Sequence, residues 1–287
     1  MTEMTILVTG GNGQLGCALR LASAESHHRY IFTDIEELDI TSATAIEEFF
    51  HCEKVDIVVN CAAYTAVDLA EENEAKADEI NHKAVALLAD ACRRHNATLI
   101  HISTDYIFSG KANTPYREES APAPLNAYGR TKLAGERAIA ESGCKSIILR
   151  TSWLYSEYGK NFVKTMLSLM ASRSEVRVVA DQMGTPTYAG DLARAITYII
   201  DSGQSERLGV YHYSNMGECS WYEFAVEIAR LSGIDCTVIP CTTADYPTTA
   251  TRPQYSVLDK RKSIATFGLT IPEWRESLRH CIENLSK

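Results

Sequence analysis

The stretch Thr5-Ile-Leu-Val-Thr-Gly-Gly-Asn-Gly-Gln-Leu-Gly16 decides the fold of this chain of 287 residues. Its apolar first part predicts a buried strand, and the glycines that follow predict a tight turn into a helix. Glycines at this spacing let a pyrophosphate approach the backbone, and the free N–H groups of the helix start attract its negative charge. We therefore expect a dinucleotide to bind at this turn. The residues expected to hold it are Gly10, Gly11, Asn12, Gly13, Gln14, Leu15 and Gly16.

The first half of the chain alternates short apolar runs with longer helical patterns. The predicted strands are Thr5–Thr9, Tyr30–Thr33, Asp56–Cys61, Thr98–Ser103 and Ser146–Arg150, and the predicted helices are Gln14–Ala24, Thr44–Cys52, Glu71–His95 and Asn126–Glu141. This alternation indicates βαβ units, and continuous apolar strands are expected where helices cover both faces of a sheet. The predicted fold class is α/β, a Rossmann-like doubly wound parallel sheet with a smaller C-terminal α/β substrate-binding domain.

The strict rhythm weakens after about Thr151, and the length of the chain suggests two domains. We expect the domains to be interleaved. Residues 1–151 and 174–215 would form the dinucleotide-binding domain, and residues 152–173 and 216–287 the substrate domain. In this prediction, strands near Glu175–Ala180 and Tyr211–Ser214 return to the first sheet.

The charge balance argues against polyanionic partners. Lys and Arg total 28 against 37 Asp and Glu, a net charge of -9, so the chain has no electrostatic footprint for a nucleic acid or an anionic membrane. The nine cysteines are scattered without CxxC spacing and the eight histidines are dispersed, so no metal site is predicted. The N-terminus lacks the features of a signal peptide, and no apolar run has the length of a spanning helix, so a cytoplasmic location is expected.

Three polar residues in the middle of the chain form a second constellation. Thr104 stands at the end of a predicted strand, and Tyr128 and Lys132 are four residues apart on a predicted helix, so they share a face. A lysine cation stabilises a phenolate and can lower the pKa of a tyrosine by about 1–3 units. We expect these residues to transfer a proton, because the ligand crevice of a parallel sheet lies at its strand ends. The alternative is a pair of partly exposed residues on a surface helix.

Further cofactor contacts are expected at other strand ends. Asp34 stands eighteen residues after Gly16, near the position where an acid binds the adenosine ribose of NAD. The alternative for Asp34 is a turn residue at the end of a strand, and the choice between NAD and NADP stays open. The remaining contacts are expected at Asp39 and Ile40, which would flank the adenine, and at Cys61, Ala62 and Ala63 in the crevice.

Taken together, these residues resemble the extended short-chain dehydrogenase/reductase family, and more closely the dTDP-4-dehydrorhamnose reductases, over nearly the whole chain. The segments that carry the likeness are Thr9–Gly16, Asn60–Asp68, Ile102–Phe108, Tyr128–Glu136, Arg150–Tyr155, Asn161–Met166, Asp181–Thr187, and Arg252-Pro253 with Ser256–Leu258. The glycine turn and the Tyr-x-x-x-Lys pair are generic to the superfamily. The Thr-Asp-Tyr-x-Phe, Thr-Ser-Trp and Gln-x-Gly-x-Pro-Thr segments are much more specific.

The resemblance implies that NADPH or NADH reduces the ketone of dTDP-4-dehydro-β-L-rhamnose to give dTDP-L-rhamnose. It implies that Tyr128 protonates the oxyanion, that Lys132 tunes Tyr128 and binds the nicotinamide ribose, and that Thr104 holds the reacting oxygen. Tyr64 is implied as a further cofactor contact. The implied substrate contacts are Val67, Thr104, Asp105, Trp153, Asn161 and Arg252, the last at the diphosphate. A dTDP-sugar is the implied partner of a monomer or homodimer. The resemblance also allows Mg²⁺, for which the sequence shows no ligand cluster.

One difference from related families narrows the set of reactions that we expect this chain to catalyse. Sugar-nucleotide dehydratases place Asp-Glu after the threonine, whereas Asp105-Tyr106 follows Thr104 here, so the acid that dehydration needs is missing. Two alternatives to a reductase remain. One is a nucleotide-sugar 4-epimerase with the same fold and Tyr/Lys pair, and the other is a noncatalytic dinucleotide-binding regulatory subunit.

Overall fold

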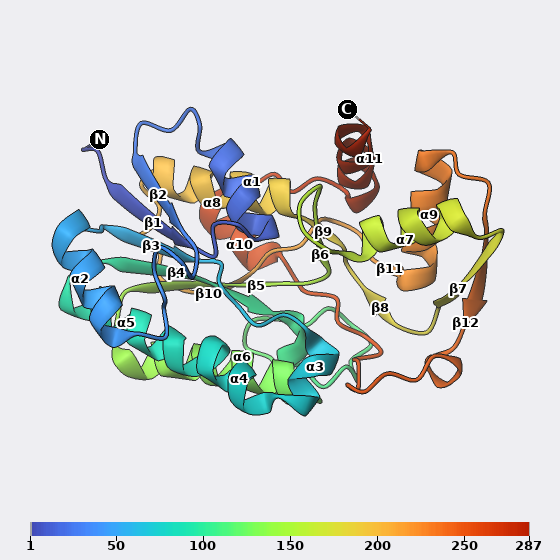
Figure 1. Ribbon diagram of the computed structural model, residues 1–287, viewed down its shortest axis with the longest axis horizontal. Coiled ribbons are helices and arrows are strands. Elements are labelled where there is room, and N and C mark those ends of the chain that lie inside the picture. The colour runs from blue at the N-terminus through green and yellow to red at the C-terminus, as the bar shows by residue number, and fades with distance from the viewer. Residues whose placement is uncertain (1, 287) are drawn as a thin grey trace.

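The computed structural model describes residues 2–286 and has a six-stranded parallel sheet at its centre (Figure 1). The strand order is β10–β5–β4–β3–β1–β2. The strands are β1 Thr5–Thr9, β2 Arg29–Thr33, β3 Ile57–Asn60, β4 Thr98–Thr104, β5 Ser146–Thr151 and β10 Gly209–His212. Strand order reverses between β1 and β3, which pair side by side, and this is where a doubly wound sheet opens its ligand crevice. The predicted fold class is confirmed.

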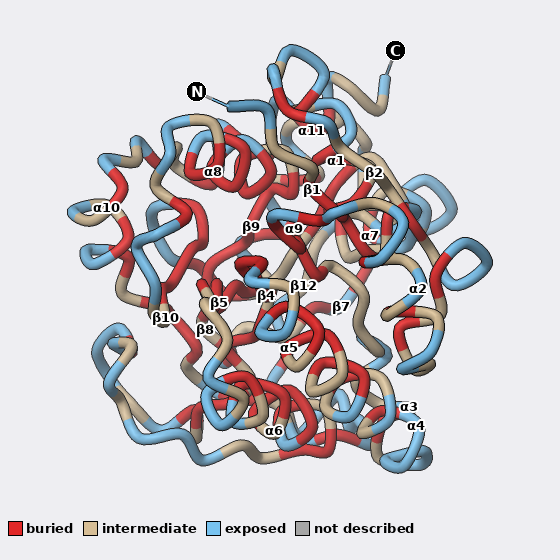
Figure 2. The backbone as a smooth tube through the Cα atoms, turned by 90° about the vertical axis from the view of Figure 1, so that its left-hand side faces the viewer, coloured by how far each residue is buried: buried red, intermediate tan, exposed pale blue. Residues whose placement is uncertain are grey.

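Helices cover both faces of this sheet (Figure 1). One face carries α1 Gln14–Ala22, α8 Ala189–Asp201 and α10 Arg261–Phe267, and the other carries α2 Ala43–Glu53, α5 Ala84–Arg94 and α6 Ala127–Ser142. Ile6 and Val8 of β1 enter the first core and Leu7 enters the second, and all three are fully buried. Figure 2 shows the buried residues concentrated along the strands and the inner sides of the helices. Burial on both faces explains the continuous apolar runs of the sequence.

A second, smaller unit stands to the right of the sheet in Figure 1 and has its own hydrophobic core. Its helices are α7 Phe162–Ser172, α9 Trp221–Ser232 and α11 Trp274–Leu285, and its parallel strands are β7 Glu175–Val179 and β12 Thr237–Cys241. Two short pairings lie beside it, β8 Met183–Gly184 with β11 Cys219–Ser220 and β6 Leu154–Tyr155 with β9 Thr187–Tyr188. Two 3₁₀ turns lie at Asp105–Ile107 and Thr243–Asp245.

The two strands expected to return to the first sheet behave differently. β10 does return, in parallel register beside β5. The expectation for Glu175–Ala180 is wrong, because β7 pairs with β12 outside the first sheet. Val176 and Val178 of β7 are buried while Glu175 and Arg177 are exposed, so this strand has one solvated face. A sheet covered by helices on both faces would bury both charges. The residue ranges given above for the two domains stay a prediction.

The expected helix Glu71–His95 is interrupted. It consists of α3 Val67–Glu72, α4 Glu74–Asp78, a π-helical turn Glu79–Lys83, and α5. Asn73 breaks the helix with φ −129° and ψ 51°. The π turn carries Asn81, whose side chain accepts a bond from Tyr64 N at 2.8 Å and donates to Tyr64 O at 3.1 Å. The irregular turn therefore holds the loop after β3 at the edge of the crevice. Across residues 2–286, no helix is both long and apolar enough to cross a membrane.

Candidate active site

The glycine turn after β1 forms a bare backbone cradle. Gly10 has φ +65°, and a Cβ on it would lie 2.7 Å from Ala62 N, so a side chain there would collide with the loop after β3. A Cβ on Gly16 would collide with the Gly10 carbonyl, so only glycine lets α1 pack against the turn. Gly13 caps α1 without a side-chain hydrogen bond, which leaves N–H groups of the first helical turn free for an anion. The cradle has the space and the free donors that a pyrophosphate needs.

Two adjoining cavities meet at this cradle and share Gly10, Gly13, Cys61 and Ala63. The first, of about 520 Å³, is also lined by the predicted contacts Asp34, Asp39, Ile40 and Ala62. The second, of about 440 Å³, is also lined by the predicted residues Gln14, Leu15, Thr104, Asp105, Tyr128, Lys132 and Trp153. The arrangement suits an extended dinucleotide, with its adenosine in the first cavity and its nicotinamide end in the second.

Asp34 lies at the mouth of the first cavity. Its Oδ2 accepts a hydrogen bond from Asn12 N at 3.0 Å, so the carboxylate is held against the glycine turn. Asp39 is tied to Thr41, whose N–H and hydroxyl donate to Oδ1 at 2.9 and 2.7 Å and lower the pKa of Asp39. Of the two carboxylates, Asp34 is therefore the better placed to meet the ribose hydroxyls.

Tyr128 stands in the first turn of α6. The helix starts where it does because the Asn126 side chain accepts the Gly129 N–H at 2.8 Å. Burial raises the pKa of Tyr128 to about 12, partly offset by the nearby Thr104 side chain. The expectation that the pKa of this phenol is lowered is therefore wrong for the structure. Burial is the largest cause and the Asp105 carboxylate acts in the same direction, and a sequence pattern shows no burial.

Lys132 lies one turn further along α6 and is 1% exposed. Its Nζ donates to the Ile102 carbonyl at 2.6 Å and lies 3.2 Å from His101 Nε2. Burial lowers the pKa of Lys132 to about 8, although Glu136 and Cys61 act in the opposite direction. Residues of strand β4 thus hold the ammonium group of Lys132, which lines the second cavity.

Asp105 follows Thr104 at the end of β4 and is 2% exposed. Its Oδ1 accepts a hydrogen bond from the Thr104 hydroxyl at 3.1 Å, and Oδ2 is buried without a protein partner among the described residues. Burial raises the pKa of Asp105 to about 7, although the nearby Ser256 and Thr104 hydroxyls act in the opposite direction. A polar atom without a partner beside the cavity suits a hydroxyl group of a substrate.

The other predicted residues do not line either cavity. Gly11 and Asn12 shape the turn, and Tyr64 is pinned by Asn81. Val67 begins α3, and Arg252 pairs with Asp68 beside it. Asn161 caps α7 and donates to Gln14 Oε1 at 2.9 Å, so it reaches the second cavity through Gln14. Gly11, Asn12, Gly16, Tyr64, Val67, Asn161 and Arg252 are not among the residues that line the two cavities.

Several residues of the site were missed by the sequence analysis. Lys76 lines the first cavity, and Ser152, Gly159 and Lys160 line the second. His101 lies behind Lys132 and is itself hydrogen-bonded to Asn60 at 3.1 Å. A cation at a helix position or a buried histidine in an apolar strand carries no local signal that separates it from ordinary surface or core residues.

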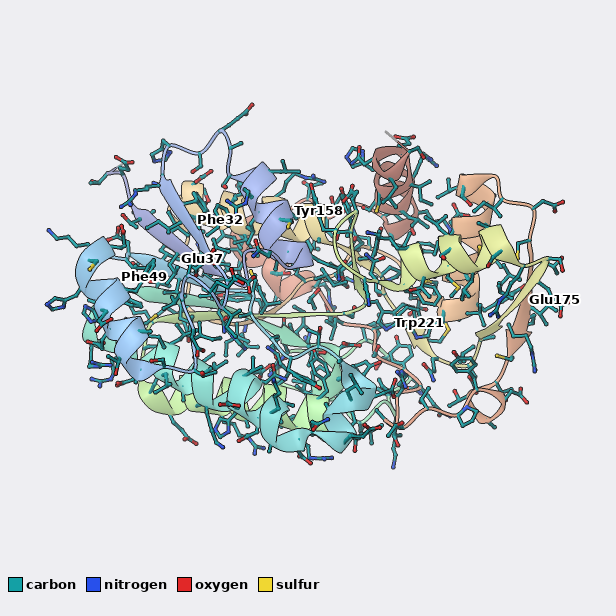
Figure 3. All side chains as sticks on the ribbon, in the orientation of Figure 1. Phe32, Glu37, Phe49, Tyr158, Glu175 and Trp221 are labelled. Atoms are coloured by element: carbon teal, nitrogen blue, oxygen red, sulfur yellow. The ribbon has the colours of Figure 1, made fainter. Side chains whose placement is uncertain are left out.

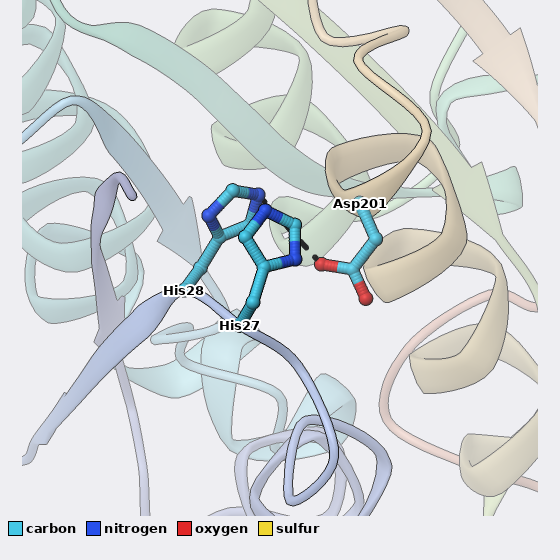
Figure 4. A group of neighbouring side chains, drawn as sticks. All are labelled: His27, His28 and Asp201. Carbon is cyan, nitrogen blue, oxygen red and sulfur yellow. Dashed lines mark ion pairs between the residues drawn. The ribbon is translucent and has the colours of Figure 1, made fainter. Parts of the chain in front are cut away.

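One group of side chains in residues 2–286 has metal-binding spacing, His27, His28 and Asp201 (Figure 4). His28 Nδ1 accepts a hydrogen bond from Met4 N at 3.2 Å, so in the neutral ring the proton is on Nε2. Nε2 lies 3.9 Å from Asp201 Oδ1 and has no hydrogen-bond partner among the described residues, and Asp201 Oδ1 accepts from the Ser26 hydroxyl at 2.7 Å. The ring therefore presents a proton to this group and not the lone pair that a metal needs.

The parallel sheet, the glycine cradle, and the Thr104, Tyr128 and Lys132 side chains around one cavity define a Rossmann-type reductase of the short-chain dehydrogenase class. Comparison with known families is more specific. The chain belongs to the family described as the RmlD substrate binding domain, whose model matches residues 4–287. The resemblance seen in the sequence is confirmed.

Individual relatives are similar over their full length. The chain is 40% identical over 286 residues to the dTDP-4-dehydrorhamnose reductase of Aggregatibacter actinomycetemcomitans, covering 96% of this chain and 97% of the relative. The crystal structure of a dTDP-4-dehydrorhamnose reductase from Clostridium acetobutylicum has a TM-score of 0.95 at 45% identity, covering 99% of this chain and 100% of that one. The same enzyme from Bacillus anthracis, in complex with NADP, has a TM-score of 0.95 at 38% identity and the same coverage.

Proposed function

We propose that this protein is an oxidoreductase that reduces the 4-keto group of dTDP-4-dehydro-β-L-rhamnose to give dTDP-L-rhamnose, a step of deoxysugar nucleotide biosynthesis. The observation that carries the proposal is that Thr104, Tyr128 and Lys132 line one cavity that opens onto the glycine cradle. The relatives named dTDP-4-dehydrorhamnose reductase support the substrate, and the structural relative in complex with NADP supports a nicotinamide cofactor.

The nicotinamide cofactor supplies the hydride, and the chain supplies the geometry and the proton. The Thr104 and Tyr128 side chains line the same cavity, and together their hydroxyls hold the ketone oxygen. Tyr128 donates its proton to this oxygen as negative charge develops on it. With a pKa raised to about 12 by burial, the phenol stays protonated at neutral pH, as a proton donor must. The ammonium group of Lys132 then stabilises the phenolate that is left.

We propose the individual site roles on the same grounds. The residues of the glycine turn hold the pyrophosphate, Asp34 the adenosine ribose, and Lys132 the nicotinamide ribose. Asp105 and Trp153 contact the sugar, and Arg252 contacts the diphosphate of the substrate. NADPH and NADH both remain candidates, and the descriptions of the relatives lend no support to Mg²⁺. We also keep the two-domain division, the cytoplasmic location and a monomeric or homodimeric state as proposals.

Replacing Tyr128 tests the proposal. Tyr128→Phe removes one oxygen and is expected to lower kcat about 10³-fold, within the range for losing a general acid, while NADPH still binds. Tyr198→Phe is the matched control, because Tyr198 is 47% exposed and lies on α8. Undiminished turnover in Tyr128→Phe would exclude the mechanism. Tightly bound NAD in the purified protein would favour the epimerase, and a stoichiometric enzyme partner without reductase activity would favour the regulatory subunit.

A further inference from the structure

Trp153 has a backbone conformation that a bulky side chain rarely adopts. Its φ is +47°, in the left-handed region, and it directly follows Thr151 and Ser152 at the end of β5. A non-glycine residue stays in this region only when its surroundings hold it there. The flanking backbone is held, since the Ser152 hydroxyl donates to the Thr185 carbonyl at 2.7 Å and Thr187 N donates to the Trp153 carbonyl at 3.1 Å. This conformation turns the indole into the second cavity, which it lines.

The indole of Trp153 is stacked on the indole of Trp221. The ring centroids are 3.5 Å apart and the planes differ by 11°. Trp221 is the first residue of α9 and packs, partly buried, against the core of the smaller unit (Figure 3). Behind it lies Phe162 of α7, with its ring centroid 4.6 Å from that of Trp221. One wall of the cavity is therefore backed by the hydrophobic core of the smaller unit.

Gly184 lies close against the Trp153 ring. A Cβ on Gly184 would lie 2.5 Å from Cε2, 2.6 Å from Cζ2 and 2.9 Å from Nε1 of Trp153, so no side chain fits there. Gly184 pairs with Cys219 across the β8–β11 ribbon, and Ser220 of the same ribbon caps α9. The ribbon thus fixes Gly184 and Trp221 relative to each other.

We propose that Trp221 and Gly184 are positioning residues that hold the Trp153 indole as a rigid wall of the sugar-nucleotide site. The inference deepens the proposed function and rests on it for the identity of the ligand. An aromatic wall suits the apolar C–H surface of a deoxysugar ring, and a wall that is already fixed spares the substrate the cost of ordering it. Trp221 acts through Trp153 and is not given a contact with the reacting atoms.

The experiment compares Trp221→Ala, Trp221→Phe and Gly184→Ala with Tyr222→Ala, a control on the neighbouring residue of α9. Three quantities are measured: KM for dTDP-4-dehydrorhamnose, Kd for NADPH, and the circular-dichroism couplet that two stacked indoles produce. Trp153→Phe and Trp221→Phe assign the couplet, because the third tryptophan of the chain, Trp274, is unchanged in both.

We expect KM to rise about tenfold in Trp221→Ala and in Gly184→Ala, less in Trp221→Phe, and not in Tyr222→Ala, with Kd for NADPH unchanged. Gly184→Ala keeps both indoles and its φ allows alanine, so a weakened couplet in this variant shows directly that Trp153 has moved. An unchanged couplet and KM in Gly184→Ala, or an equal loss of NADPH and substrate binding in Trp221→Ala, would overturn the inference. If the wild-type protein did not reduce the sugar nucleotide, the proposed function would fail, and the couplet of Gly184→Ala would still decide whether the wall is held as described.

Discussion

Asp68 and Arg252 are 184 residues apart in the sequence and form a two-pronged ion pair. Arg252 Nη2 lies 2.6 Å from Asp68 Oδ2, and Nη1 lies 3.1 Å from Oδ1. The same carboxylate accepts the Ala250 N–H at 3.0 Å, and its bond with Arg252 keeps the pKa of Asp68 below its usual value. The pair ties the segment that holds Arg252 to the start of α3 and fixes the orientation of the guanidinium.

Arg252→Gln is predicted to weaken substrate binding and leave the fold intact. If Arg252 binds the diphosphate, KM for the dTDP-sugar should rise at least about tenfold, since a charge-assisted bond of about 1.5–3 kcal/mol is lost. The Asp68 side chain is 43% exposed, so the free energy of unfolding should fall by no more than about 1 kcal/mol. Steady-state kinetics and urea unfolding measure the two effects. Asp68→Asn is the matched control, because it leaves the cation in place. An equal rise of KM in both variants would mean that the pair acts only as a tether.

The sequence predicted the parts of the site that lie close together along the chain. The β1 strand, the glycine turn and the start of α1 fall within Thr5–Gly16, and Tyr128 and Lys132 lie on one helix, so short-range patterns were enough. β7 was misplaced because alternating Val and charged residues fit any strand with one solvated face. Trp221, Gly184 and the Asp68–Arg252 pair depend on contacts between distant segments, which a single sequence does not record. The direction of the Tyr128 pKa was missed for the same reason, because burial is a property of the folded chain.

Asp105→Asn is predicted to be more stable than the wild type at neutral pH and above. Burial raises the pKa of Asp105 from its ordinary value of 3.8 to about 7, so between these values the folded state binds more protons than the unfolded state. The stability that the protonated carboxyl contributes is full below about pH 4 and is lost as the pH rises through about 7. The loss over this window is about 4 kcal/mol at about 1.4 kcal/mol per pKa unit.

The test is the difference in free energy of unfolding between the wild type and Asp105→Asn, measured by urea titrations from about pH 5 to about pH 8. This is roughly the window in which most folded proteins are stable. The free energy of unfolding of the wild type should fall relative to that of Asp105→Asn as the pH rises. Asp90→Asn is the control, because Arg93 lowers the pKa of the exposed Asp90. Asp90 is therefore ionised in the folded and the unfolded state across this pH range, and its variant should show no change of the difference with pH. A difference that does not change with pH would show that Asp105 is ionised throughout the range.

Asp34→Ser is predicted to shift the cofactor preference toward NADPH. The carboxylate, held by Asn12 N at the mouth of the first cavity, accepts ribose hydroxyls but repels the 2′-phosphate of NADPH. The ratio of kcat/KM for NADPH to that for NADH should rise about tenfold, the effect expected of one repulsive charge near the surface. Asp39→Asn is the control, because this carboxylate is occupied by Thr41. An unchanged ratio in Asp34→Ser would place the ribose elsewhere.

Lys132→Met is predicted to remove activity and to change how stability depends on pH. Burial lowers the pKa of Lys132 from 10.5 to about 8, so the charged form opposes folding. Between about pH 8 and 10.5 the unfolded state binds more protons than the folded state, so the stability contributed by Lys132 rises with pH across this window. Below about pH 8 the full cost of burying the cation applies, about 3 kcal/mol at about 1.4 kcal/mol per pKa unit.

The free energy of unfolding of the wild type should therefore rise by about 3 kcal/mol relative to that of Lys132→Met as the pH is raised through this window. Taking the difference in free energy of unfolding between the wild type and Lys132→Met cancels the titration of every other lysine and tyrosine. Near neutral pH, Lys132→Met should be the more stable protein, unless the Ile102 carbonyl, which accepts from Nζ at 2.6 Å, is left buried without a donor. The pH slope of the difference does not depend on that loss. A flat difference together with lost activity would mean that Lys132 is charged in both states with an ordinary pKa, and that β4 and Glu136 compensate fully for its burial.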